Sequence, residues 1–143
     1  MASRRLCAIG SMMYLLDTNI CIHRINEQPA GVMQRLIQVG RESLAIYTVT
    51  VAELAFGAAK NTRPGTRGKL ENFVAHFPIL DWNQGAARIY GDVCKALEAK
   101  GQRIGERDLL LACPIPALDS TMVTNTTREL ERIEGLKLEN WVG

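Results

Sequence analysis

The chain has 143 residues, 47% of them hydrophobic and 22% charged, which suits one domain with its own core and excludes a disordered polypeptide. Its 17 Lys and Arg residues against 15 Asp and Glu residues give a net charge of +2, so bulk charge alone does not indicate a nucleic-acid partner. Four cysteines without C-x-x-C spacing and only two histidines argue against a zinc site and favour free thiols in a reducing compartment.

The N-terminal third of the sequence predicts two buried strands separated by helices. Residues 1–11 are expected to form a flexible leader, and residues 12–143 a single domain. An apolar run over residues 13–16 predicts a buried strand that stops at Asp17. After it we expect helices over residues 20–25 and 29–39, the second with proline in its first turn and Gly40 as its stop, and a buried strand over residues 44–47.

The middle of the chain predicts mainly helices. Thr50 and Glu53 have the spacing of a capping box, which predicts that a helix opens there. The basic, Gly- and Pro-containing segment 60–69 is expected to be a loop that is either solvated or in contact with phosphate or a partner protein. A helix over residues 70–77, a short strand over 79–80 and a long amphipathic helix over 83–100 follow, with Gly101 as its stop.

The C-terminal part predicts a short helix and two more strands. A helix is expected from about Asp108 to Cys113, and Pro114 and Pro116 are expected to cut it short. A strand over residues 121–123, a second capping box from Thr126 to Glu129 and an edge strand over residues 136–138 complete the chain. Buried strands that alternate with amphipathic helices predict a three-layer α/β/α sandwich around a mostly parallel sheet. No apolar run is long enough to predict a membrane span.

Four acidic residues share one kind of position, just after a predicted strand or in the first turn of a predicted helix. They are Asp17, Glu53, Asp108 and Glu129. Strand C-termini and helix N-termini meet at one edge of an open α/β sheet, where ligands bind. Clustered carboxylates repel one another and need a cation, and an all-oxygen ligand set favours Mg²⁺ or Mn²⁺. The pattern therefore indicates metal-dependent chemistry on phosphoesters.

Each of these acids also has a purely structural interpretation. Asp17 could cap the helix that follows it, and Glu53 and Glu129 each occupy the third position of a capping box. Asp108 could simply complement the positive end of a helix dipole. Convergence of the four side chains decides between the two interpretations.

The segments around these acids resemble PIN-domain ribonucleases, and among them the VapC-type toxins of type II toxin–antitoxin systems. The likeness runs in order through residues 15–19, 50–57, 100–112 and 123–133, and closes with residues 136–141. It implies a bacterial, cytoplasmic endoribonuclease with a five-stranded parallel sheet. It also implies Mg²⁺ or Mn²⁺ held by Asp17 and Asp108, with Glu53 completing the ligand shell or orienting water and Glu129 as a weaker, more distant acid.

The resemblance also implies accessory residues and partners. Thr18 and Thr124 match hydroxyl positions that line the site in this family. Members are neutralised by a small VapB-type antitoxin, form homodimers, and reach operator DNA only through the antitoxin. They cut structured RNA, with initiator tRNA as one expected substrate.

Two departures from the family pattern support an alternative function. Pro114 and Pro116 stand where relatives continue a helix, and Thr126 stands where they have a second Asn or an Asp. A catalytically degenerate PIN domain that serves only to bind its antitoxin and regulate its operon is therefore the second hypothesis. A third, a signalling domain phosphorylated on Asp17, is disfavoured because no paired acid lies beside that residue.

Overall fold

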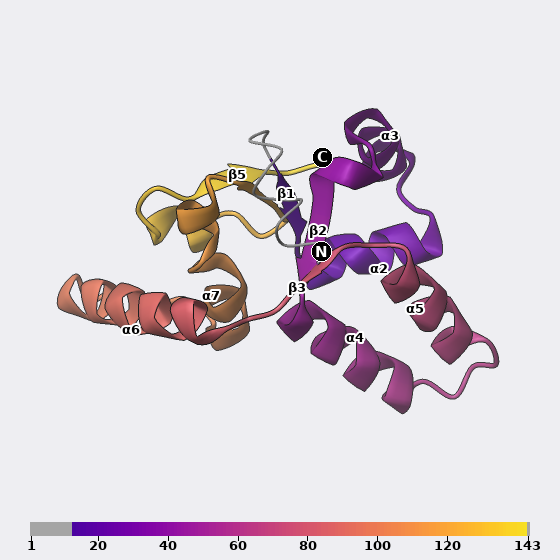
Figure 1. The fold of residues 1–143 in the computed structure, drawn as a ribbon, viewed down its shortest axis with the longest axis horizontal. Coiled ribbons are helices and arrows are strands. Elements are labelled where there is room, and N and C mark those ends of the chain that lie inside the picture. Colours follow the sequence, from indigo (N-terminus) through magenta and orange to yellow (C-terminus); the bar gives the residue numbers. More distant parts are fainter. Residues whose placement is uncertain (1–12, 143) are drawn as a thin grey trace.

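A computed structural model describes residues 13–142, and the expected leader lies outside the described residues. One five-stranded parallel sheet forms the middle of the domain in the order β3-β2-β1-β4-β5 (Figure 1). Its strands are β1 Tyr14–Leu16, β2 Leu44–Tyr47, β3 Ile79–Leu80, β4 Thr121–Val123 and β5 Lys137–Glu139. The number of strands and their parallel pairing confirm the prediction, and only the last strand is displaced, by one residue.

Helices cover both faces of this sheet, as the alternating pattern predicted. The helices of residues 13–142 are α2 Thr18–Asn26, α3 Ala30–Val39, α4 Thr48–Lys60, α5 Thr66–Ala75, α6 Gln84–Ala99 and α7 Glu106–Ala112. Single 3₁₀ turns are η1 Arg41–Ser43, η2 Ile115–Leu118 and η3 Leu130–Arg132. In Figure 1, α2 to α5 lie on one side of the sheet and α6 and α7 on the other.

The strands divide their side chains between two cores because successive residues point to opposite faces. Leu15 pairs in register with Ala45 and Met122, and all three belong to the core under α6 and α7. Leu16 and Ile46 belong to the other core, under α2 to α5. This division confirms the three-layer α/β/α sandwich.

Two predicted helix starts are wrong. The helix assigned to a capping box at Thr50 begins two residues earlier, at Thr48, without a side-chain cap, and Thr50 is buried with a hydroxyl that has no hydrogen-bond partner. The second capping box, at Thr126, opens no α-helix, since only the 3₁₀ turn η3 follows it. The sequence pattern fails at both places because the acid has another partner in the tertiary structure: Glu53 accepts from the Thr18 hydroxyl and Glu129 from the Gly105 amide.

Smaller differences concern helix bounds. The basic loop is shorter than predicted because α5 already begins at Thr66. The helix α7 begins at Glu106 and ends at Ala112, so the prolines shorten it as expected, and Pro114 leads into η2. The long helix α6 ends at Ala99, and Gly101 follows it with a φ of 66°, in the left-handed region that glycine adopts without strain.

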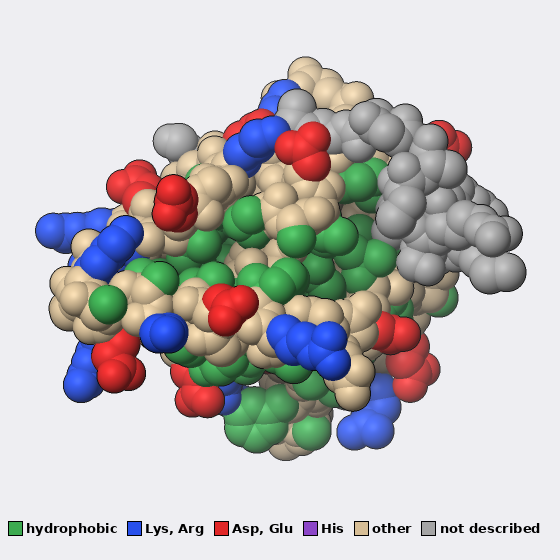
Figure 2. Space-filling model, turned by 60° about the vertical axis from the view of Figure 1, so that its left-hand side comes forward, with side chains coloured by type: hydrophobic (Ala, Val, Ile, Leu, Met, Phe, Trp, Pro, Cys, Tyr) green, Lys and Arg blue, Asp and Glu red, His purple; other side chains and the backbone are tan. Residues whose placement is uncertain are grey.

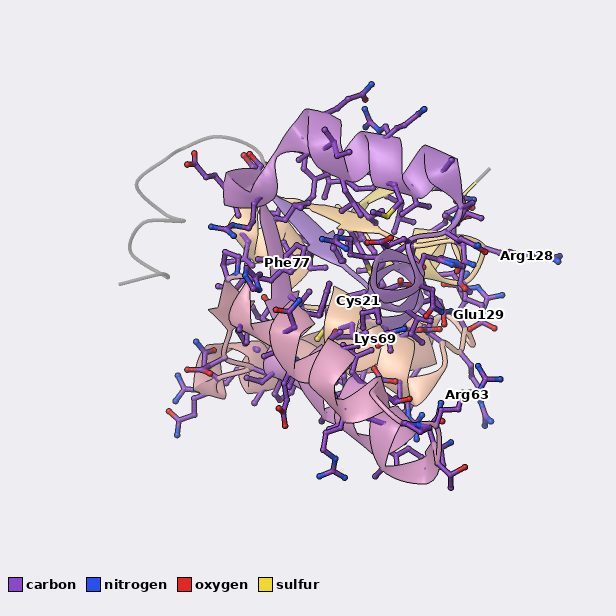
Figure 3. The ribbon with its side chains drawn as sticks, turned by 90° about the vertical axis from the view of Figure 1, so that its right-hand side faces the viewer. Cys21, Arg63, Lys69, Phe77, Arg128 and Glu129 are labelled. Carbon is purple, nitrogen blue, oxygen red and sulfur yellow. The ribbon has the colours of Figure 1, made fainter. Side chains whose placement is uncertain are left out.

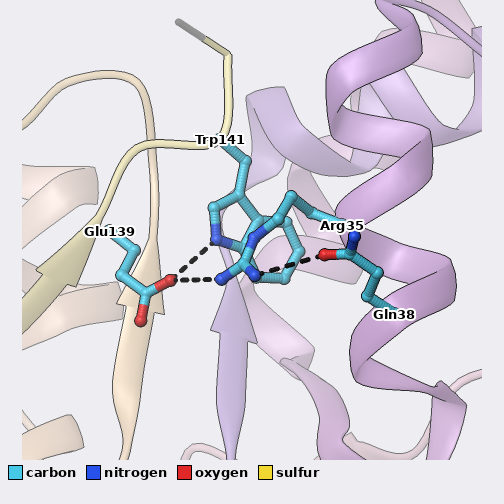
Figure 4. Close-up of polar contacts among 4 residues, drawn as sticks. All are labelled: Arg35, Gln38, Glu139 and Trp141. Atoms are coloured by element: carbon cyan, nitrogen blue, oxygen red, sulfur yellow. Dashed lines mark hydrogen bonds and ion pairs between the residues drawn. The ribbon is translucent and has the colours of Figure 1, made fainter.

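A cluster of polar and aromatic contacts fastens the C-terminal segment to α3 (Figure 4). Arg35 pairs with the Glu139 carboxylate at 2.8 Å and lies over the Trp141 ring at 5.1 Å. The Trp141 indole N–H donates to the same carboxylate oxygen at 3.0 Å, and Gln38 accepts from Arg35. The cluster holds β5 and the residues after it against the helical layer.

The face beside α6 is partly apolar. From this side, hydrophobic side chains gather in the middle of the surface between scattered charged ones (Figure 2). A hollow of about 820 Å³ opens there, with Ile89, Pro114 and Leu118 among its lining residues. None of the helices in residues 13–142 combines the length and apolar content that a bilayer crossing requires.

Candidate active site

Asp17 is held rigidly at the end of β1, where it belongs both to a helix cap and to the acidic cluster. Its Oδ1 accepts a hydrogen bond from the Ile20 amide at 2.8 Å, so it is the N-cap of α2. Its Oδ2 accepts from the Thr124 hydroxyl at 2.5 Å, and Thr124 in turn stands directly after β4. Both side chains are almost fully buried. The neighbouring strands β1 and β4 thus fix this carboxylate from two sides.

Glu53 reaches the same edge of the sheet from the second turn of α4. The Thr18 hydroxyl donates to its Oε1 at 2.8 Å, and Arg107 lies 3.7 Å from its Oε2. The acid assigned to a helix cap by its sequence spacing therefore serves a contact between α2, α4 and α7. Thr18 and Thr124, both predicted as accessory hydroxyls, each hold one carboxylate of the cluster.

Asp108 lies in the first turn of α7, and Glu129 supports the start of that helix. A Glu129 carboxylate oxygen accepts a hydrogen bond from the Gly105 amide at 3.2 Å, and Gly105 is the N-cap of α7. Figure 3 shows Glu129 at the outer edge of the molecule, beside Arg128. Glu129 does not line the cavity of the other three acids, but its carboxylate is close enough to Asp108 to raise the pKa of that acid.

Three of the four predicted acids line one cavity of about 260 Å³. Asp17, Glu53 and Asp108 contribute their side chains to it, whereas Glu129 does not. Six further residues line the cavity and were not among the predicted site residues, namely Asn19, Phe56, Gly57, Lys60, Arg107 and Leu111. A signal for three of them was present, because residues 56, 57 and 60 follow Glu53 at the 3, 4 and 7 spacing of one helix face.

The electrostatics of the cavity are those of crowded negative charge. Burial raises the pKa of Asp17, and the nearby Asp108 and Glu53 carboxylates raise it further, against hydrogen bonds from Thr124 and Ile20 that lower it. The pKa of Asp108 is also raised, first by burial and then by Glu129 and Glu53. The cavity therefore favours any ligand that brings positive charge.

This donor set fits a hard divalent cation in chemistry, although its side chains are not closed around one. Within residues 13–142 no three Asp, Glu, His or Cys side chains stand close enough together to hold a metal ion as they are placed. Carboxylate and hydroxyl oxygens from β1, α4 and α7 nevertheless surround one space, and Mg²⁺ and Mn²⁺ prefer oxygen ligands and keep several waters.

Comparison with known proteins extends these observations over nearly the whole chain. The family model for the PIN domain matches residues 14–136. The chain is 37% identical over 132 residues to ribonuclease VapC2 of Rickettsia felis, a match that covers 91% of this chain and 98% of that protein. It is 35% identical over 131 residues to the tRNA(fMet)-specific endonuclease VapC of Shigella flexneri, with the same coverage.

Solved structures show the same likeness. The crystal structure of VapBC2 from Rickettsia felis, bound to a DNA fragment from its promoter, contains a chain that superposes with a TM-score of 0.82 at 35% identity. The match covers 91% of this chain and 99% of that one.

Proposed function

The chain belongs to the PIN domain family, and we propose that Asp17, Glu53 and Asp108 are the catalytic acids of its ribonuclease site. The chain is the ribonuclease component of a type II toxin–antitoxin module and hydrolyses RNA phosphodiesters, as its VapC relatives do by name. One observation carries the assignment of the site: three acids far apart in the sequence, each from a different element, line one cavity.

A divalent cation, Mg²⁺ or Mn²⁺, is the cofactor that this acid cluster suits, with Asp17 and Asp108 as its direct ligands. When bound, it supplies the positive charge that stabilises a phosphodiester under attack. Thr124 and the Ile20 amide fix the Asp17 carboxylate in place. The Thr18 hydroxyl holds Oε1 of Glu53 and Arg107 lies 3.7 Å from Oε2, and from this position Glu53 completes the ligand shell or orients water.

Glu129 has a supporting role in the proposed site. It holds the Gly105 amide at the start of α7 and thereby positions Asp108. We therefore treat it as a positioning residue, in keeping with the expectation that it is the weaker and more distant acid.

The partners follow from the relatives with solved structures. A VapB-type antitoxin is the cognate partner, because chains of the same fold at 35% and 31% identity were solved as VapBC complexes on DNA. We expect operator DNA to be reached through that antitoxin. We assign the expected homodimer contact to the hollow beside α6, because apolar side chains such as Ile89 and Leu118 line it.

RNA is the substrate, and basic side chains surround the acids. Lys60 and Arg107 line the cavity itself. Figure 3 shows Arg63 and Arg128 extending on the side of the molecule where Glu129 lies. Initiator tRNA is the substrate to test first, because one relative is named for it. We expect the reaction to take place in the bacterial cytoplasm, where such RNA is made.

The ribonuclease function is favoured over a degenerate, purely binding PIN domain. Pro114 and Pro116 end the helix only after Asp108, which already lies in its first turn and faces the cavity. The relatives over 91% of the chain are named as nucleases.

A cleavage assay with matched variants tests the proposed site. Purified protein is incubated with initiator tRNA and Mg²⁺, Mn²⁺ or EDTA, beside Asp17→Ala and Asp108→Asn. Asp92→Asn, at an exposed position of α6, serves as the control for loss of an acid elsewhere. We expect metal-dependent cleavage by the wild type and Asp92→Asn only. Equal cleavage by all four proteins would mean that the activity comes from a contaminant.

A further inference from the structure

An aromatic side chain stands exposed at the acidic cavity. Phe56 lines the cavity together with Glu53, which lies one turn earlier on α4, and 54% of its surface is accessible to solvent. Phenylalanine is mostly buried in folded proteins, and here it contributes little to the core while it faces the proposed reaction centre. This exposed ring is therefore suited to contact a ligand with a flat apolar surface.

A cation accompanies the ring. The Lys60 ammonium lies 4.3 Å from the centroid of the Phe56 ring, one turn further along α4. Arg107 lines the same cavity from α7 and keeps 70% of its side chain exposed while it pairs with Glu53. A flat ring beside two cations and a cluster of acids is complementary to a nucleotide, which carries an aromatic base and an anionic phosphate.

We propose that Phe56 is a stacking platform for an unpaired base adjacent to the scissile phosphate, with Lys60 holding the phosphate attached to that base. The subsite rests on the proposed ribonuclease function and requires that the nucleotide bound at Phe56 is unstacked from its neighbours. Bases within a duplex are already stacked and cannot lie on a side chain, whereas bases in loops can. A protein segment on Phe56 is the competing occupant, and the test below distinguishes it.

Binding measurements in a cleavage-inactive background isolate the subsite. The parent protein carries Asp108→Asn, and the probe is initiator tRNA in which each loop nucleotide in turn is made abasic. Phe56→Leu removes the ring while keeping an apolar side chain, and Phe56→Tyr keeps the ring. Ile37→Ala, at an exposed apolar position on α3, controls for general loss of apolar surface.

We expect Phe56→Leu to weaken binding roughly 5- to 150-fold, the range that base–aromatic stacking spans. Phe56→Tyr and Ile37→Ala should bind like the parent. One abasic position should weaken binding by the parent but leave binding by Phe56→Leu unchanged, since ring and base act as a pair. Lys60→Gln should reduce the salt dependence of binding by about one phosphate contact.

The outcomes separate this inference from the function on which it rests. If Phe56→Leu binds as tightly as the parent and keeps the same abasic profile, the subsite is refuted while the nuclease function stands. Loss of antitoxin binding alone in Phe56→Leu assigns the ring to a protein contact and also refutes it. If the wild type neither binds nor cuts any RNA, the proposed function fails together with the subsite.

Discussion

Thr124→Val tests the hydrogen bond between the Thr124 hydroxyl and the Asp17 carboxylate in the acidic cluster. The substitution keeps the shape of the side chain but removes the hydroxyl that donates to Asp17 Oδ2 at 2.5 Å. A hydrogen bond to a charged group contributes about 1.5–3 kcal/mol, and this one is buried, so the free energy of unfolding at neutral pH should fall by about that amount. For a chain of this length each kcal/mol corresponds to roughly 2–4 °C in Tm.

The loss of stability should depend on pH in a definite direction. The pKa of Asp17 is higher in the folded protein than in the unfolded chain, mainly because of burial. The charged carboxylate therefore destabilises the folded state. This destabilisation is absent at acidic pH, where the group is protonated in both states, and it grows as pH rises through the pKa of the folded protein. Without the Thr124 hydroxyl, which lowers the pKa, this cost increases. The difference between the variant and the wild type should therefore be largest at neutral pH and shrink in acid to about 0.5–1.5 kcal/mol, the value of a neutral hydrogen bond.

Denaturant unfolding in EDTA at several pH values measures this dependence. Thr124→Ser keeps the hydroxyl and is the matched control, so it should show no growth of the deficit with pH. A deficit for Thr124→Val that is the same at every pH would refute the reasoning. A Thr124→Ser variant that loses stability with the same pH dependence as Thr124→Val would also refute it.

Three further outcomes follow from individual contacts. Arg35→Ala should lower Tm by roughly 2–4 °C, because its exposed ion pair and its cation–π contact together contribute about 1 kcal/mol to stability. The control Gln34→Ala, at an exposed position of the same helix, should leave Tm unchanged. Glu129→Gln keeps an acceptor for the Gly105 amide and should retain far more cleavage than Glu129→Ala, as measured by single-turnover rates. Pro114→Ala combined with Pro116→Ala should leave cleavage close to wild type, and a large gain of activity would revive the degenerate alternative.

The fold was predictable from local patterns, because the first three strands are short apolar runs and the long helices each have an apolar face, whereas the edge strand β5 reads Lys-Leu-Glu. The start of α4 could not be predicted in this way. Thr50 and Glu53 match a capping box by spacing, but in the tertiary structure Glu53 accepts a hydrogen bond from Thr18. The position of Glu129 was hidden for the same reason: its partner is Gly105, 24 residues away in the sequence. Spacing within one segment carries no information about such long-range partners.

Asp17 shows why the structural and catalytic interpretations of an acid need not exclude each other. One carboxylate has two oxygens: Oδ1 caps α2 through the Ile20 amide, and Oδ2 meets Thr124 at the edge of the cavity. Each carboxylate oxygen has a second lone pair, so both structural bonds can persist while the group coordinates a cation. A substitution at Asp17 removes cap and proposed ligand together, whereas Asp108→Asn removes a proposed ligand but no side-chain cap. Variants of Thr124, which donates to Asp17, and of Glu129, which holds the start of the helix that carries Asp108, change the site without removing a proposed ligand.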